Sequence, residues 1–119
     1  MAFPSQAQVE IIVNQIPDNT PSGDTIFIVG SFNQWNPDDH RYFLSPRKDG
    51  TLGLVFEIEA AYFEYKFHRG NWSSVEGSEL GEPMANRPFI QQGEGLNTQT
   101  VQIKSWEDLE RYKITVQAL

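Results

Sequence analysis

Turn-forming residues recur so often along this chain that only short secondary-structure elements fit between them. Clusters of Pro, Gly, Asn, Asp and Ser interrupt the sequence at residues 17–24, 36–39, 45–50, 76–88 and 93–95. The runs between these clusters are rich in β-branched and aromatic residues, which is typical of strands. We predict strands at residues 8–16, 25–30, 53–59, 63–69, 88–91 and 97–104. Short strands separated by turns indicate an all-β protein, either a sandwich or a barrel.

Alternation of apolar and polar residues assigns faces within these runs. In Phe63–His68 the three aromatic residues share one face, and Glu64, Lys66 and His68 share the other. We take the aromatic face as the core face, which directs Lys66 outward. Residues 26–29 are apolar on both faces, which predicts a strand in the centre of a sheet.

The composition narrows the class of partner. The 119 residues suit a single domain. A formal net charge of −7 repels a phosphate backbone, so we expect no nucleic-acid partner. No apolar run approaches the ~20 residues of a membrane-spanning helix, so we expect no membrane partner either. Residues 1–6 contain no signal-peptide pattern, and the absence of cysteine is compatible with a reducing compartment such as the cytoplasm.

Two of the three tryptophans lie in polar, turn-rich segments just beyond predicted strands. Trp35 precedes Asn36-Pro37, and Trp72 follows Gly70-Asn71. An indole in such a place offers a flat apolar face, on which the C–H face of a pyranose ring can stack while the sugar hydroxyls stay hydrated. Each tryptophan could equally cap the core at the end of a strand. The sequence context is consistent with both interpretations.

Two polar residues are candidate companions of these tryptophans. Lys66 lies on the outward face of its predicted strand, six residues before Trp72, and its ammonium can donate hydrogen bonds to sugar hydroxyls. Asn86 carries both a donor and an acceptor, which a pair of hydroxyls requires. The alternatives are a solvated strand lysine and an ordinary turn asparagine before the next strand.

Catalytic and metal-binding interpretations find little support in the sequence. His68 lies near Ser73 and Ser74, but no Gly-x-Ser-x-Gly elbow surrounds a serine. Residues 38–40 (Asp-Asp-His) are adjacent, and adjacent side chains rarely converge on one metal ion.

Acidic and phosphate-binding motifs give the same answer. Glu76 and Glu79 could form a pair of carboxylates for glycoside hydrolysis, but we expect both to be solvated in a polar loop. No glycine-rich phosphate loop occurs. We therefore expect no catalytic residue, no metal and no cofactor, and the chain is not expected to be an enzyme.

Three blocks of sequence resemble a known group of modules. Residues 26–37 (IFIVGSFNQWNP) are similar to the opening of starch- and glycogen-binding modules, carbohydrate-binding module families 20 and 48. Phe63–Phe67 (FEYKF) followed by Gly70-Asn71-Trp72 resembles their next landmark. Asn86-Arg87 resembles the Asn-Arg of glucoamylase-type modules. The first two blocks are also similar to the glycogen-binding domain of the AMP-activated kinase β subunit, and the likeness covers roughly residues 8–104.

The resemblance implies an immunoglobulin-like antiparallel β-sandwich of about seven to eight strands. It implies non-catalytic binding of α-glucan, meaning starch, glycogen or maltooligosaccharide. By the same resemblance, Trp35 and Trp72 would form the sugar platforms, and Lys66 and Asn86 would be their hydrogen-bonding partners.

The chain departs from this pattern in two places. Residues 75–85 form a longer loop than in glucoamylase-type modules, which would displace Asn86. No pair of tyrosines matches a second sugar site. These departures leave two other functions open, namely a protein-interaction or assembly domain without sugar binding, and an accessory module of a larger glycan-active enzyme.

Residues 105–119 fall outside the resemblance, so we divide the chain into a β-sandwich at 1–104 and a C-terminal extension at 105–119. Ser105 is expected to be the N-cap of a short helical turn, with Asp108 three residues on. Residues 112–117 alternate like a strand. They would form an added strand, or an arm that pairs with a second copy of the chain at an exposed edge to give a homodimer.

Overall fold

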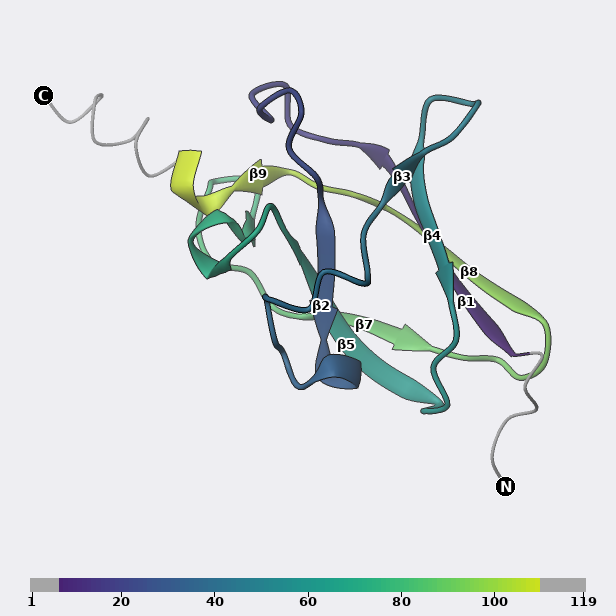
Figure 1. The fold of residues 1–119 in the computed structure, drawn as a ribbon. Helices are drawn as coiled ribbons and strands as arrows, with labels where there is room; N and C mark the ends of the chain where they lie inside the picture. Colours follow the sequence, from purple (N-terminus) through teal and green to yellow (C-terminus); the bar gives the residue numbers. More distant parts are fainter. Residues whose placement is uncertain (1–6, 110–119) are drawn as a thin grey trace, which may run out of the picture.

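A computed structural model describes residues 7–109 of the chain. The strands fall into two layers that face each other, with the first and last described residues at opposite ends of the domain (Figure 1). The strands are β1 (Gln8–Gln15), β2 (Phe27–Gly30), β3 (Ser45–Pro46), β4 (Leu52–Phe56), β5 (Tyr62–His68), β6 (Glu76–Gly77), β7 (Arg87–Ile90), β8 (Leu96–Gln102) and β9 (Ser105–Trp106). Two short 3-10 turns, η1 (Ser31–Asn33) and η2 (Trp72–Ser74), follow β2 and β5.

The two main sheets have the strand orders β3-β4-β1-β8 and β2-β5-β7, and β6 pairs with β9 in a small third sheet. All pairings between these strands are antiparallel except that of β1 with β8, which is parallel. The prediction of an all-β sandwich is thus confirmed. On its other side β2 forms a bridge from Phe27 to Phe43, so it has neighbours on both edges.

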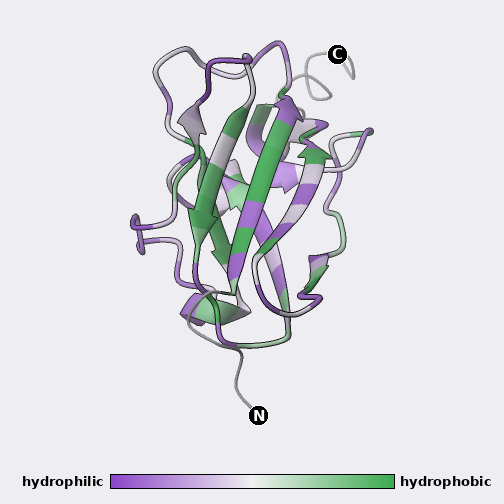
Figure 2. Ribbon diagram, turned by 90° about the vertical axis from the view of Figure 1, so that its right-hand side faces the viewer, coloured by the Kyte–Doolittle hydropathy of each residue, from purple (hydrophilic) through white to green (hydrophobic). Residues whose placement is uncertain are grey.

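Apolar side chains of the two sheets meet between the layers. Figure 2 shows that hydrophobic residues gather on the strands, whereas the loops at both ends of the sandwich are mostly hydrophilic. The aromatic face of β5 lies in this core, as predicted: Phe63, Tyr65 and Phe67 are each at most 1% exposed. Phe63 stacks on Phe89 of β7, with their ring centroids 5.0 Å apart. Each such buried side chain stabilises the fold by roughly 1.5–3 kcal/mol.

The segment between η2 and β7 is held by a buried ion pair. Glu76 is fully buried, and its carboxylate accepts hydrogen bonds from Arg87 Nη2 at 2.6 Å and from the Phe67 backbone N–H at 3.0 Å. Arg87 Nη2 also donates to the Gln102 carbonyl oxygen at 2.7 Å. The expectation that Glu76 is solvated is therefore wrong. Its carboxylate has a cation and a backbone donor, and these offset the cost of removing it from water.

Residues 105–109 pack against the sandwich. Ser105 lies in β9, and its hydroxyl donates to the Ser78 carbonyl oxygen at 2.7 Å, so it does not cap a helix; a helical turn begins at Glu107 instead. Trp106 has no exposed surface, and its indole N–H donates to Thr20 Oγ1 at 2.8 Å. The predicted strand at residues 112–117 lies outside the described residues. In the part from 7 to 109, no helix is long and apolar enough to cross a membrane.

Candidate functional site

The candidate site lies on the outer face of the β2-β5-β7 sheet. Because β2 and β5 pair from Phe27↔His68 to Gly30↔Tyr65, Lys66 and His68 share the face that points away from the core. Trp72 follows β5 in η2, and Trp35 follows β2 in the loop after η1. Two segments that are distant in sequence thus bring one tryptophan each to the same face.

The loop that carries Trp35 has an unusual backbone. Gln34 and Trp35 have φ angles of 58° and 56°, which lie in the left-handed region that residues other than glycine rarely adopt. The Trp35 N–H donates to the Gly30 carbonyl oxygen at 2.9 Å, which closes the loop. Gly30 itself packs so closely on β5 that a Cβ there would lie 2.3 Å from the Glu64 carbonyl oxygen. Strained backbone of this kind persists only where surrounding contacts maintain it, and it is found most often at active sites and ligand-binding sites.

Polar contacts hold this loop from inside. Asn33 is buried; its Oδ1 accepts from the Gly30 N–H at 3.0 Å, and its Nδ2 donates to Asp39 Oδ2 at 3.3 Å. The Arg41 guanidinium donates two hydrogen bonds of 2.8 Å to the Asp39 carboxylate. These bonds lower the pKa of Asp39 to about 2. The carboxylate therefore stays charged, and the loop stays tied, at any pH near neutral.

Trp72 is supported by a row of aromatic rings. The centroid of its indole lies 6.4 Å from that of His68, which stacks on Phe27 at 5.5 Å, and Phe27 stacks on His40 at 4.3 Å. His68 lies on the outer side that alternation predicts, yet it has no exposed surface. Its Nδ1 accepts from the Gly70 N–H at 2.9 Å. Burial, together with the nearby His40, lowers the pKa of His68 to about 4, so the ring beneath Trp72 is neutral at pH 7.

The two indoles form one platform. Their ring centroids are 6.4 Å apart and their planes are inclined at 33°. Trp72 is 42% exposed and Trp35 is partly exposed, whereas Trp106 is fully buried. Neither Trp35 nor Trp72 is inside the sandwich, and the two do not lie on different sides of it. The arrangement offers an open, slightly angled apolar surface.

Polar groups continue the same face along β5. Lys66 is partly exposed opposite Val29. Asn86 is exposed, and its Nδ2 donates to Glu64 Oε1 at 3.0 Å, while the Tyr62 hydroxyl donates to Glu64 Oε2. These two hydrogen bonds lower the pKa of Glu64, and the one from Tyr62 has the larger effect. Within residues 7–109 the amide oxygen of Asn86 accepts no hydrogen bond, so it can accept one from a ligand.

The Ser74 hydroxyl, which the sequence places near His68, has backbone partners in the structure. The Ser74 hydroxyl accepts from the Arg69 N–H at 3.0 Å and donates to the Asn71 carbonyl oxygen at 2.9 Å, so these bonds leave it unpaired with His68. Among the described residues, no group of three or more His, Cys, Asp or Glu side chains could hold a metal ion.

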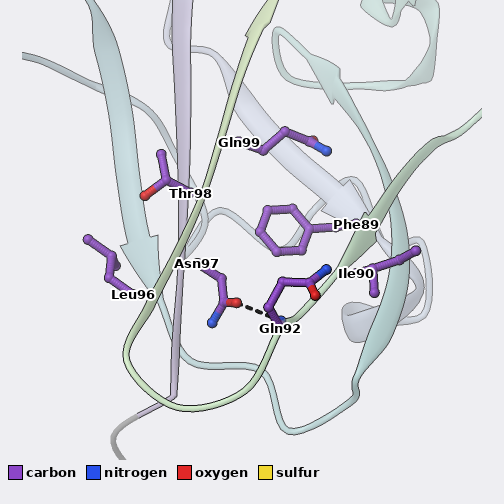
Figure 3. Close-up of a pocket in the computed structure, with 7 residues that line it drawn as sticks. All are labelled: Phe89, Ile90, Gln92, Leu96, Asn97, Thr98 and Gln99. Carbon is purple, nitrogen blue, oxygen red and sulfur yellow. Dashed lines mark hydrogen bonds between the residues drawn. The ribbon is translucent and has the colours of Figure 1, made fainter.

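A separate hollow of about 360 Å³ lies at the open corner of the sandwich between β7 and β8 (Figure 3). Phe89 points into it, and side-chain amides of Gln92, Asn97 and Gln99 surround it. Asn97 Oδ1 accepts from the Gln92 N–H at 2.6 Å, and Gln99 Nε2 donates to the Pro88 carbonyl oxygen at 3.1 Å. Asn97 and Gln99 of β8 thus hold this strand to β7 and the residues after it, and none of the predicted site residues lines the hollow.

Sequence reasoning placed Glu64 on this face without naming it as a site residue, and it missed Tyr62, because the predicted strand began at residue 63. The signal was present in the alternation of β5, which places both on the side of Lys66.

Comparison with known proteins gives three similar segments. The chain is 33% identical over 94 residues to an α-amylase of Niallia circulans, which covers 78% of this chain and 7% of that protein. It is 31% identical over 116 residues to an amylopullulanase of Thermoanaerobacter thermohydrosulfuricus, covering 93% of this chain and 8% of that protein. An amylopullulanase of Thermoanaerobacterium thermosulfurigenes is 29% identical over 112 residues, 89% of this chain and 6% of its own length. No family model matches the chain.

The chain therefore spans only 6–8% of the length of these relatives. The similarity is to a short segment of three much longer proteins, which are named as an α-amylase and two amylopullulanases.

Proposed function

We propose that this domain binds α-glucan without catalysis, by stacking glucose units on Trp35 and Trp72. The observation that carries the proposal is the pair of partly exposed indoles, 6.4 Å apart on one face and inclined at 33°. An inclined pair of apolar surfaces matches two successive sugar rings of a curved α-linked chain better than a flat surface does. Stacking buries the apolar C–H face of each sugar and leaves its hydroxyls in contact with water.

Lys66 and Asn86 supply the polar contacts in this proposal. The ammonium of Lys66 donates to sugar hydroxyls, and the free amide oxygen of Asn86 accepts from one. Lys66 lies on the outer face of β5, next to the His68 that supports Trp72, and Asn86 is hydrogen-bonded to Glu64 on the same face. Neutral sugar hydroxyls need such donors and acceptors, and they are indifferent to the net charge of −7.

The relatives support the choice of ligand. Their names describe enzymes that act as an α-amylase and as amylopullulanases, and the present chain matches a small segment of each. We propose that the domain is an accessory module of a glycan-active enzyme and keeps it on its polymer. Two stacked rings and a few hydroxyl contacts on an open surface should bind in the micromolar to millimolar range, about 4–8 kcal/mol.

Calorimetric titration with maltoheptaose tests this proposal, because the readout does not depend on the indoles. The wild type is expected to bind saturably, and Trp35→Ala and Trp72→Ala are expected to abolish binding at millimolar sugar. Val55→Ala is the matched control: Val55 is also 42% exposed, but it lies on β4 in the other sheet. Cellohexaose, with β-linked glucose, tests the preference for the α linkage.

Three results would overturn the proposal. The first is the absence of wild-type binding at millimolar maltoheptaose, and the second is retention of binding in both tryptophan variants while circular dichroism shows them folded. The third is release of shorter sugars during incubation, which would contradict non-catalytic binding.

A further inference from the structure

A second exposed apolar pair lies on the same face as the two tryptophans. Tyr62 is 50% exposed and Ile90 is 62% exposed, and the two stand directly opposite each other in the pairing of β5 with β7. Tyr62 has the same side-chain direction as Lys66 and His68, since all are separated by even numbers of residues along β5. Nothing in the proposed platform of Trp35 and Trp72 uses this pair.

The pair lies along the strand from the tryptophans, not on another side of the molecule. Tyr62 is six residues from His68, the strand residue next to Trp72, a distance of roughly 20 Å along an extended strand. Glu64 and Asn86 occupy the space between them and are hydrogen-bonded to each other at 3.0 Å. The outer face of β5 thus carries groups that can contact a sugar along its whole length, from the tryptophans near His68, through the polar side chains of Lys66 and Glu64, to Tyr62.

The orientation of Tyr62 is fixed by the same carboxylate that holds Asn86. The Tyr62 hydroxyl donates to one oxygen of Glu64, and Asn86 Nδ2 donates to the other. A ring held in this way loses little further freedom when a ligand stacks on it, which favours binding. The Glu64 carboxylate therefore links the side chain of Tyr62 to that of Asn86.

We propose that Tyr62 and Ile90 form a further subsite for the same α-glucan, so that a chain longer than the tryptophan pair can hold contacts both. The inference rests on the proposed function, since it extends that site. An aromatic ring, with hydrogen-bonding groups beside it, suits a sugar in the way that the first platform does. The domain then discriminates by chain length, and its affinity rises from maltotriose to maltoheptaose.

The test compares the affinities for maltotriose and maltoheptaose by calorimetry. In the wild type, maltoheptaose is expected to bind about five- to tenfold more tightly than maltotriose. Tyr62→Ala and, independently, Ile90→Ala are expected to bring this ratio close to one. Tyr62→Phe keeps the ring and should keep most of the ratio, and Val55→Ala should keep all of it.

Several outcomes overturn the inference while leaving the proposed function standing. One is a wild-type ratio near one, and another is a ratio that persists in both Tyr62→Ala and Ile90→Ala. A third is self-association in analytical ultracentrifugation that these two variants abolish, because the pair would then be covered by a second copy of the chain. If Trp35→Ala and Trp72→Ala both bind the two sugars as well as the wild type does, the proposed function itself fails.

Discussion

Lowering the pH from 7 to 5 is expected to destabilise the fold through His68. Burial and the neighbouring His40 lower the pKa of this imidazole to about 4, against 6.5 for an unperturbed histidine. The folded state therefore resists a proton that the unfolded state accepts below pH 6.5. The free energy of unfolding is therefore unaffected by the protonation of His68 above pH 6.5, and it falls progressively as the pH decreases toward 4.

The magnitude follows from the two pKa values. A pH of 5 is about one and a half units below the pKa of the imidazole in the unfolded state, so this imidazole is almost fully protonated there. The imidazole of the folded state is still mostly neutral at pH 5. Each unit corresponds to 1.36 kcal/mol, so the free energy of unfolding should fall by about 2 kcal/mol between pH 7 and pH 5. The carboxylates whose pKa values are lowered, such as Asp39 and Glu64, titrate mainly below this window.

Urea unfolding at pH 7 and at pH 5, followed by tryptophan fluorescence, measures this difference. His68→Phe keeps an aromatic ring between Phe27 and Trp72 but cannot be protonated, so its stability should change little between the two pH values. Its absolute stability will be lower, because the Gly70 N–H loses its acceptor, but the comparison is made within each variant. His40→Gln should retain most of the pH effect. Equal pH dependence in the wild type and in His68→Phe would refute the reasoning.

The remaining predictions concern the parts that hold the fold and shape the site. Glu76→Gln should lower the free energy of unfolding by about 3–5 kcal/mol, because it leaves the largely buried guanidinium of Arg87 without its carboxylate. Urea unfolding measures this loss. Trp106→Ala should cost about 3–5 kcal/mol in the same assay, since it opens a cavity and leaves the Thr20 hydroxyl without its indole donor. Gln34→Gly should stabilise the protein by about 0.5–1 kcal/mol, because it relieves a left-handed backbone at some cost in chain entropy.

Each of these has a result that would contradict it. A loss below about 1 kcal/mol for Glu76→Gln would mean that the ion pair between Glu76 and Arg87 stabilises the fold no more than an exposed ion pair does, which would contradict the prediction. A Trp106→Ala variant as stable as the wild type would mean that residues 105–109 do not belong to the core. Destabilisation by Gln34→Gly would show that the glutamine side chain, not the backbone, sets the local energy there.

The sequence predicted the long strands well, because their side chains obey a period of two. β5 was expected at 63–69 and runs over Tyr62–His68 with its aromatic face in the core. β3, β6 and β9 have two residues each, which is too few for any periodicity to show. Glu76 is buried because it pairs with Arg87, eleven residues further along the chain. The polarity of its own segment had predicted a solvated side chain.

For the site, sequence position identified residues but not their arrangement. Trp35 and Trp72 stood out as aromatic residues in turns, yet their approach to 6.4 Å depends on two left-handed residues that no local propensity favours. Alternation placed His68 outward, but it could not show that an indole would cover it.

The parallel pairing of β1 with β8 has a mechanical consequence. The two strands pair in one register from Gln8↔Leu96 to Val13↔Val101, and after an irregularity Gln15 pairs with Gln102, so Gln8 and Gln102 lie at opposite ends of this pair. Tension applied between the two ends of the domain would therefore pull the strands past each other and load their hydrogen bonds together instead of one after another. We expect a single high rupture force in force–extension measurements, and gradual unravelling at low force would contradict it.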